Sequence, residues 1–116
     1  ALAVEADKVG HELAHFWFKH EYPSINLTNN LNSELISALA ELVYSMDTYN
    51  GEYYLMSQFS TDDISDIIKP FWDNPNSENL DKYLKVFRNK RPGYNNFVFD
   101  RGSFLEQVEN FKNLFK

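Results

Sequence analysis

Apolar side chains recur at helical spacing along most of this chain. Near the start they share one face of a helix that we predict over residues 3–19, and we expect that face to lie in the core. Its apolar members are Val9, Leu13, Phe16 and Trp17. Tyr22-Pro23 ends the run, because the residue before a proline is pushed out of the helical region.

A polar loop over residues 24–32 leads to a second predicted helix. We place its start at Asn32 or Ser33, since both residues are good N-caps. Glu34 then falls in the first turn, where a carboxylate suits the helix dipole. One apolar stripe is expected to face the core, formed by Leu35, Leu39, Leu42 and Met46.

In the middle of the chain, the apolar pattern of residues 49–59 fits either a helix or a strand. We predict two further helices after this segment. Ser60 with Asp63 starts a short helix, which Pro70 bends or ends. After a turn at residues 74–76, Ser77 caps a longer helix, which Pro92-Gly93 ends. The core side chains of that longer helix are Leu80, Tyr83, Leu84 and Phe87.

Residues 94–101 read as a loop or a short extended piece before the last helix. Ser103 and Glu106 form a capping box for that helix. Its buried side chains are expected to be Leu105, Val108, Phe111 and either Leu114 or Phe115. The pattern therefore predicts a mainly α chain, with about five helices and little or no sheet, over residues 1–116 as one helical domain or subdomain.

Composition narrows the chemistry open to this chain. At 116 residues and 43% apolar content it can build one domain with a real core. There is no cysteine, so a metal ion would have to be held by histidines and carboxylates. This absence is compatible with a cytoplasmic location but leaves the location open. No apolar run approaches the length of a membrane span.

The charge is distributed unevenly. The net charge is −6, with the acidic side chains concentrated before residue 82, which argues against nucleic acid as a partner. A basic stretch follows on one predicted helix, and it indicates either a solvated face or a contact with an acidic neighbouring domain. It comprises Lys82, Lys85, Lys90, Arg88 and Arg91.

His11 and His15 carry the most specific chemistry. Four residues apart on a helix, both imidazoles project from one face and can hold one zinc ion, while Glu12 can move protons in a hydrolytic site. His20 falls on the opposite face and is expected at the surface.

Glu34 follows His15 after eighteen intervening residues. An antiparallel return of the second helix would bring its carboxylate to the metal as third ligand, leaving a position open for water. Glu41, two helical turns further on the same face, would accept the other N–H of a ligating histidine; an exposed carboxylate is the alternative.

These residues resemble the aminopeptidase N family of zinc peptidases, a group of gluzincins. The segment HELAHFWF over residues 11–18 is similar to the family's HELAHxWF, and the family places its glutamate ligand at the distance of Glu34. Residues 31–36 are similar to the helix of that ligand. The resemblance implies the helical part of a zincin, thermolysin-like catalytic domain that cleaves peptides with one zinc ion.

A second segment, residues 99–105, resembles the family's Y-x-[KR]-G-[AS] segment and begins 65 residues after Glu34. The family's tyrosine there donates its phenolic hydrogen to the oxyanion, whereas this chain has Phe99; Tyr94 is an alternative donor. Lys19-His20 also replaces the family's usual Gly-Asn. The family's upstream sheet and G-x-M-E-N segment do not precede residue 11, so we expect a fragment of a larger peptidase, with that upstream domain as a partner.

Three other interpretations stay open. One is a degenerate gluzincin that binds zinc or peptide without turnover. Another is an acidic helical binding protein, of the kind that inhibits nuclease toxins, with an accidental HExxH. An acidic and aromatic stretch would suit its basic partner: Asp47, Tyr49, Glu52, Tyr53, Tyr54, Asp62, Asp63, Asp66, Trp72 and Asp73. A purely structural helical scaffold is the least specific possibility.

Overall fold

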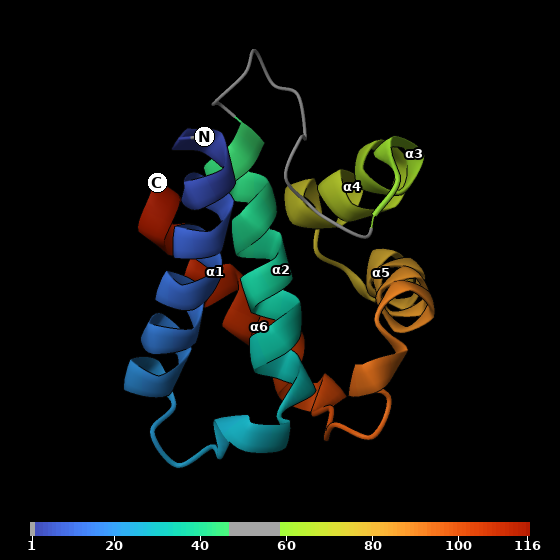
Figure 1. The fold of residues 1–116 in the computed structure, drawn as a ribbon. Helices are drawn as coiled ribbons and strands as arrows, with labels where there is room; N and C mark the ends of the chain where they lie inside the picture. Colours follow the sequence, from blue (N-terminus) through green and yellow to red (C-terminus); the bar gives the residue numbers. More distant parts are fainter. Residues whose placement is uncertain (1, 47–58) are drawn as a thin grey trace.

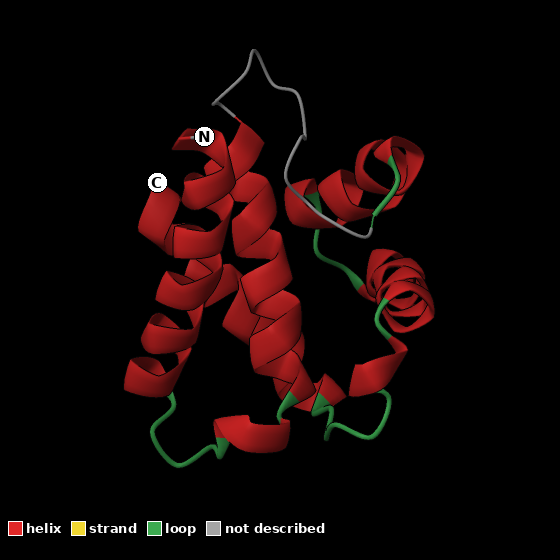
Figure 2. Cartoon of the chain, in the orientation of Figure 1, coloured by secondary structure: helices red, strands yellow, loops and turns green. Residues whose placement is uncertain are grey.

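The computed structural model describes the backbone of residues 2–46 and 59–116, and the side chains of residues 8–44 and 59–116. Two long antiparallel helices, α1 (Leu2–Glu21) and α2 (Leu31–Met46), form a hairpin joined through the 3-10 turn η1 (Leu27–Asn29) (Figure 1). The helices of the second half are α3 (Thr61–Asp63), α4 (Lys69–Asp73), α5 (Ser77–Lys90) and α6 (Arg101–Lys112). The predicted mainly α fold is confirmed (Figure 2).

Helix α2 is the centre of the molecule (Figure 1). Every side chain from Leu31 to Leu42 is buried except Glu34. The expected core positions Leu35, Leu39 and Leu42 are buried, but they form no isolated stripe, because small residues occupy much of the remaining circumference. A helix that carries apolar or small residues on every side needs packing partners on every side. Helices α1, α5 and α6 are those partners.

The face by which α1 meets α2 differs from the predicted one. The prediction put Val9, Leu13 and Phe16 in the core, yet Phe16 is 72% exposed and the other two are about half exposed. The buried positions are Gly10, Ala14 and Phe18, with Trp17 partly buried. Small side chains let the two helix backbones approach closely, and this requirement outweighs the size of the apolar residues.

The predicted starts of two helices, α2 and α5, are wrong by one to three residues. Helix α2 is capped by Asn30, whose side chain accepts the N–H of Ser33, so the predicted cap Asn32 lies inside the helix. Asn76, and not Ser77, caps α5 by accepting the N–H of Asn79. In both cases the capping oxygen belongs to an asparagine side chain that precedes the predicted cap by a few residues.

The last helix also begins earlier than predicted. Helix α6 starts at Arg101, and Ser103 donates to the carboxylate of Asp100 instead of capping the helix. The capping box with Glu106 is therefore wrong. Of the expected core residues, Val108 and Phe111 are buried and Leu105 is partly buried, whereas both Leu114 and Phe115 are exposed. The buried positions that the pattern missed are Phe104 and Gln107.

Pro70 does not end its helix. Ser60 caps the run as predicted, by accepting the N–H of Asp63, and the backbone stays helical from Thr61 to Asp73. The segment Ile64–Ile68 is a π-helix, and the N–H of Lys69 bonds to the carbonyl of Ile64. This wider turn accommodates the proline, which has no N–H to donate.

Buried polar contacts fix the other helices to α2. Asn32 donates to the carbonyl of Asp100 and to Gln107, and it accepts the N–H of Asp100, so it links α2 to the start of α6. Tyr83 donates to the carbonyl of Leu35 at 2.6 Å, which links α5 to α2, and burial raises the pKa of this phenol.

The prediction for residues 94–101 is a loop or a short extended piece; residues 95–100 form such a loop, while Tyr94 ends a 3-10 turn (Pro92–Tyr94) and Arg101 begins α6. An isolated parallel bridge pairs Asn30 with Val98 before α6 begins. Of the ambiguous segment 49–59, only Phe59 lies within the described residues, and it is buried. Among the described helices, none is long and apolar enough to cross a bilayer.

Gly10 lies where α1 packs against Tyr44 of α2. A Cβ atom at this position would overlap the ring and the Cβ of Tyr44, and the Cβ is fixed by the backbone of α2. Overpacking costs roughly 1–3 kcal/mol, whereas Ala is preferred over Gly in a helix by about 0.8–1 kcal/mol. Gly10→Ala should therefore lower the free energy of unfolding by roughly 1 kcal/mol, and by no more than about 2 kcal/mol, in urea denaturation.

Gly93→Ala is the matched control, because nothing lies within 4 Å of a Cβ atom there. Its unfolding free energy should stay close to that of the wild type. Equal stabilities of the Gly10 and Gly93 variants would show that α1 and α2 have room to separate.

Candidate metal centre

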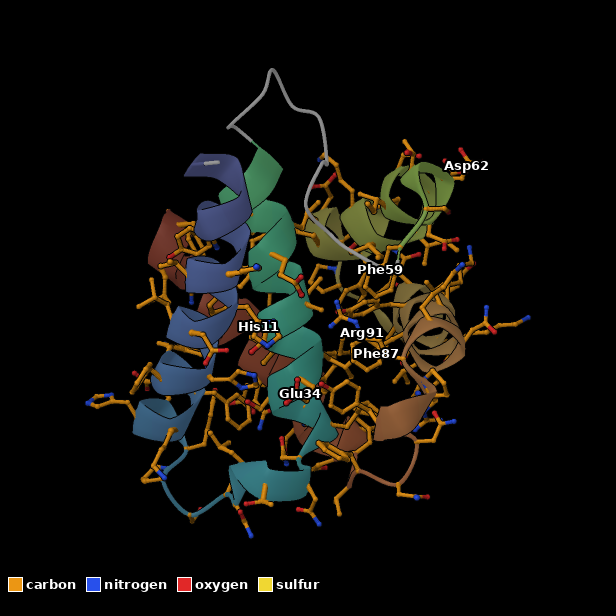
Figure 3. The ribbon with its side chains drawn as sticks, in the orientation of Figure 1. His11, Glu34, Phe59, Asp62, Phe87 and Arg91 are labelled. Atoms are coloured by element: carbon orange, nitrogen blue, oxygen red, sulfur yellow. The ribbon has the colours of Figure 1, made fainter. Side chains whose placement is uncertain are left out.

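His11 projects from the face of α1 that meets α2 (Figure 3), and the contact of His15 with Ser33 places it on the same face. Both side chains are only about one-fifth exposed. Their Nε2 atoms lie 3.2 Å apart, and the two rings meet edge to face. The i, i+4 spacing in the sequence is thus realised as two imidazole nitrogens facing one point.

Glu34 brings the third donor from the first turn of α2, as the antiparallel return predicted. Its Oε1 lies 3.6 Å from His15 Nε2. One ligand atom from each of His11, His15 and Glu34 falls within 4.8 Å of the others, so a single point between them is roughly 3 Å from all three. Bonds to zinc are about 2.0–2.2 Å long, so inward movements of roughly 1 Å complete the shell.

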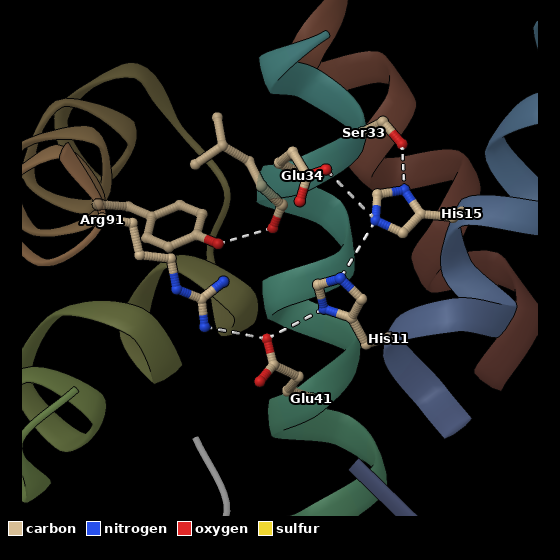
Figure 4. A network of polar contacts seen from close by, with 8 residues as sticks. His11, His15, Ser33, Glu34, Glu41 and Arg91 are labelled. Carbon is tan, nitrogen blue, oxygen red and sulfur yellow. Dashed lines mark hydrogen bonds and ion pairs between the residues drawn. The ribbon is translucent and has the colours of Figure 1, made fainter. Parts of the chain in front are cut away.

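In each imidazole, Nε2 faces the metal position, and the other ring nitrogen, Nδ1, has a polar partner of its own (Figure 4). His11 Nδ1 lies 3.3 Å from Oε2 of Glu41, the residue expected to orient a ligand, and His15 Nδ1 lies 2.7 Å from Oγ of Ser33. If both Nδ1 atoms donate, both Nε2 atoms present lone pairs to each other at 3.2 Å. Such a pair is repulsive unless a cation or a proton lies between the rings, and a metal ion removes the conflict.

The carboxylate of Glu34 also fits a metal ion. Its Oε2 is buried and has no hydrogen-bond partner in the described part of the chain. An unpartnered buried carboxylate oxygen is costly, and metal coordination is one of the few ways to compensate it. The set of two imidazoles and one carboxylate is typical of catalytic zinc sites, which keep a further position open.

Negative charge gathers around the two histidines. The pKa of His11 is raised, mainly by its hydrogen bond to Glu41, and the charges of Glu41, Glu34 and Glu12 act in the same direction, while burial opposes them. The same field that favours a proton on this ring favours a divalent cation beside it.

Glu12 lies on the solvent side of the centre. It is exposed and, with His15, lines a shallow recess of about 150 Å³, completed by Phe16, Lys19 and Leu27. The metal ligands are half-buried and the proposed proton carrier is open to solvent, which suits a site that admits a water and a substrate. His20 is exposed and paired with Glu21, away from the centre as expected.

The two candidates for the oxyanion donor differ in their surroundings. Phe99 is partly buried and packs edge to face on Phe104 at the start of α6. Tyr94 packs against Phe87 and Phe97, and burial raises the pKa of its phenol. The charge of Glu34 raises the pKa of Tyr94 further, while that of Arg91 lowers it.

Two contributors were missed in the sequence. Ser33 was considered only as a helix cap, yet its Oγ lies 2.7 Å from His15 Nδ1. Arg91 was grouped with a basic helix face, yet its side chain is 9% exposed and it donates to Glu41. Spacing gave no signal for Arg91, because its partner is 50 residues away.

The comparisons with known proteins return no relatives. No protein family, curated protein or solved structure matches this chain significantly. The resemblance to the aminopeptidase N family therefore stays an expectation from short motifs, and the functional argument depends on the geometry of the centre.

Ser33→Ala tests the support of His15. Loss of an outer partner of a metal-bound histidine typically weakens metal affinity 10–100-fold, and we expect roughly tenfold for Ser33→Ala in a zinc titration against a competing chelator. Ser37→Ala, one turn along α2, is the control. Ser37 Oγ is buried and has no hydrogen-bond partner among the residues that the structure describes, so its removal should leave zinc affinity unchanged and should not destabilise the fold. Equal zinc affinities for the two variants would contradict a role of Ser33 in the centre.

Proposed function

We propose that this chain binds one zinc ion through His11, His15 and Glu34, and that the centre hydrolyses peptide bonds in the manner of an aminopeptidase. The observation that carries the proposal is the convergence of the three ligand atoms within 4.8 Å, contributed by two helices that meet antiparallel. The separate partners of the two remote nitrogens support it, because ligating histidines usually have such partners.

The roles of the residues follow from their positions. Zinc, when bound, would polarise the scissile carbonyl and increase the acidity of water. Glu12, exposed and one residue after His11, would accept a proton from the attacking water and then deliver it to the leaving nitrogen. Tyr94 is the candidate donor to the oxyanion, since Phe99 has no hydrogen to donate.

A zinc centre without turnover is the second candidate function, and the observation that favours it is Phe99. The ring at this position packs on Phe104, so the site lacks the donor that the family resemblance implies. This candidate shares the metal ligands and differs only in the chemistry that follows binding.

The interpretation as an acidic binding protein has less support. Trp72 is buried and packs against Phe111, so it offers no surface to a basic partner. Asp62, Asp66 and Asp73 are exposed, as solvated carboxylates usually are. The other part of the acidic and aromatic stretch, residues 47–54, lies outside the described residues.

Glu34→Ala is the test of the three-ligand site. Removing the carboxylate leaves two imidazoles, so we expect zinc affinity to fall by roughly 100-fold or more, measured by calorimetry or by chelator competition. Glu21→Ala is the control, because Glu21 is exposed at the end of α1 and pairs with the surface residue His20, away from the centre. Equal affinity of wild type and Glu34→Ala would rule out the proposed site.

Glu12→Gln separates hydrolysis from binding. The amide keeps the shape of the side chain but cannot take a proton, so kcat for an unblocked dipeptide or an aminoacyl arylamide should fall roughly 100-fold or more. Zinc affinity should remain within about threefold of the wild type, since Glu12 is not a ligand. A zinc-loaded wild-type chain with no more hydrolysis than Glu12→Gln would contradict the peptidase half of the proposal and leave the non-catalytic zinc centre.

A further inference from the structure

Arg91 connects the second half of the molecule to the metal centre. It follows directly after α5, as the C-cap of that helix, and its side chain is 9% exposed. Its guanidinium donates to Oε2 of Glu41 on α2 at 3.2 Å. A charged group this deeply buried needs a specific partner, and the carboxylate of Glu41 supplies it.

Two aromatic rings hold the same guanidinium from the apolar side. The Arg91 Cζ lies 5.0 Å from the ring centre of Phe59 and 5.4 Å from that of Phe87 (Figure 3). A planar, weakly hydrated guanidinium suits such stacking better than an ammonium does. The rings restrict where the group lies, and its N–H donors restrict where the Glu41 carboxylate lies.

The oxygen of Glu41 that accepts from Arg91 is the same atom that contacts His11. Oε2 lies 3.2 Å from the Arg91 guanidinium and 3.3 Å from His11 Nδ1 (Figure 4). The resulting series of contacts runs from α5 through α2 to α1. Its last member is one of the proposed ligands, whose Nε2 faces the metal position.

We propose that Arg91 is a positioning residue of the zinc centre, which fixes the Glu41 carboxylate so that the imidazole of His11 presents Nε2 to the metal. The inference rests on the proposed zinc function and assigns to that centre a residue from outside the α1–α2 hairpin. Without Arg91, the Glu41 side chain keeps only one of these two contacts to its Oε2, and the ring of His11 loses its fixed orientation.

A buried ion pair that serves the fold alone would behave differently. Its loss would lower the stability of the protein with and without zinc by the same amount, and the affinity of the folded protein for zinc would not change. A positioning role instead changes zinc affinity in protein that is demonstrably folded, and it changes the geometry of the bound ion.

The test compares zinc affinities of Arg91→Met and Glu41→Gln with the wild type, at fixed pH and by chelator competition. Each single change should weaken binding about tenfold, the lower end for outer partners of a metal site. The double variant should bind no more weakly than the weaker single variant, because both residues act through one carboxylate. If the two losses of zinc affinity multiply in the double variant, the two residues act independently, and the proposed role of Arg91 through Glu41 is wrong.

Arg88→Met is the matched control, since Arg88 lies in the last turn of α5, three residues before Arg91, and is exposed. It should bind zinc as the wild type does. Arg91→Lys keeps the charge but loses the planar guanidinium, so its zinc affinity should lie between those of Arg91→Met and the wild type. If Arg91→Met does not fold, Arg91→Lys is compared with the wild type instead. The absorption spectrum of bound Co²⁺ reports the ligand geometry, and it should change in the Arg91 variants and remain unchanged in Arg88→Met.

The outcomes separate the inference from the proposed function. A wild-type chain that does not bind zinc would overturn the proposed function itself. If the wild type binds zinc, and the Arg91 variants bind it equally well and give the same Co²⁺ spectrum, only the proposed role of Arg91 is overturned.

Discussion

Helix α2 lies with nearly its whole circumference against other helices, so the polar groups it carries need partners inside the protein. Asn32 finds them on α6, and Ser33 finds His15 on α1. Glu41 is shared between His11 and Arg91. Glu34 and Ser37 are the exceptions, since each has one buried side-chain oxygen that no described residue satisfies, and only that of Glu34 belongs to a carboxylate. The candidate metal centre lies where the burial of α2 leaves a carboxylate oxygen without a partner among the described residues.

The close approach of α1 and α2 sets the distances in that centre. Gly10 and Ala14 on α1 occupy the buried face, and they alternate along the helix with His11 and His15. A larger side chain at either small position would separate the helices. Since the metal ligands come from both helices, packing and coordination geometry depend on the same backbone separation.

Several features were predictable from the sequence because they depend on local rules. Helical spacing located the helices, and the i, i+4 histidines with Glu34 at the start of the next helix predicted a shared site. The inner face of α1 was not predictable in the same way. The pattern favoured the large residues Leu13 and Phe16, whereas the neighbouring helix requires small ones. Arg91 was missed for a related reason, because charge suggested solvent and only the tertiary fold supplies its carboxylate and rings.

The packing of Phe111 has a consequence for spectroscopy. Both tryptophans of the chain, Trp17 and Trp72, contact the ring of Phe111, with centroid separations of 5.1 and 6.0 Å. Trp17 also follows His15 by two residues, which turns it to the opposite side of α1 from the imidazole. The intrinsic fluorescence of the protein therefore reports the docking of α6 between α1 and α4, and it is a signal for that interface that is largely independent of the polar centre.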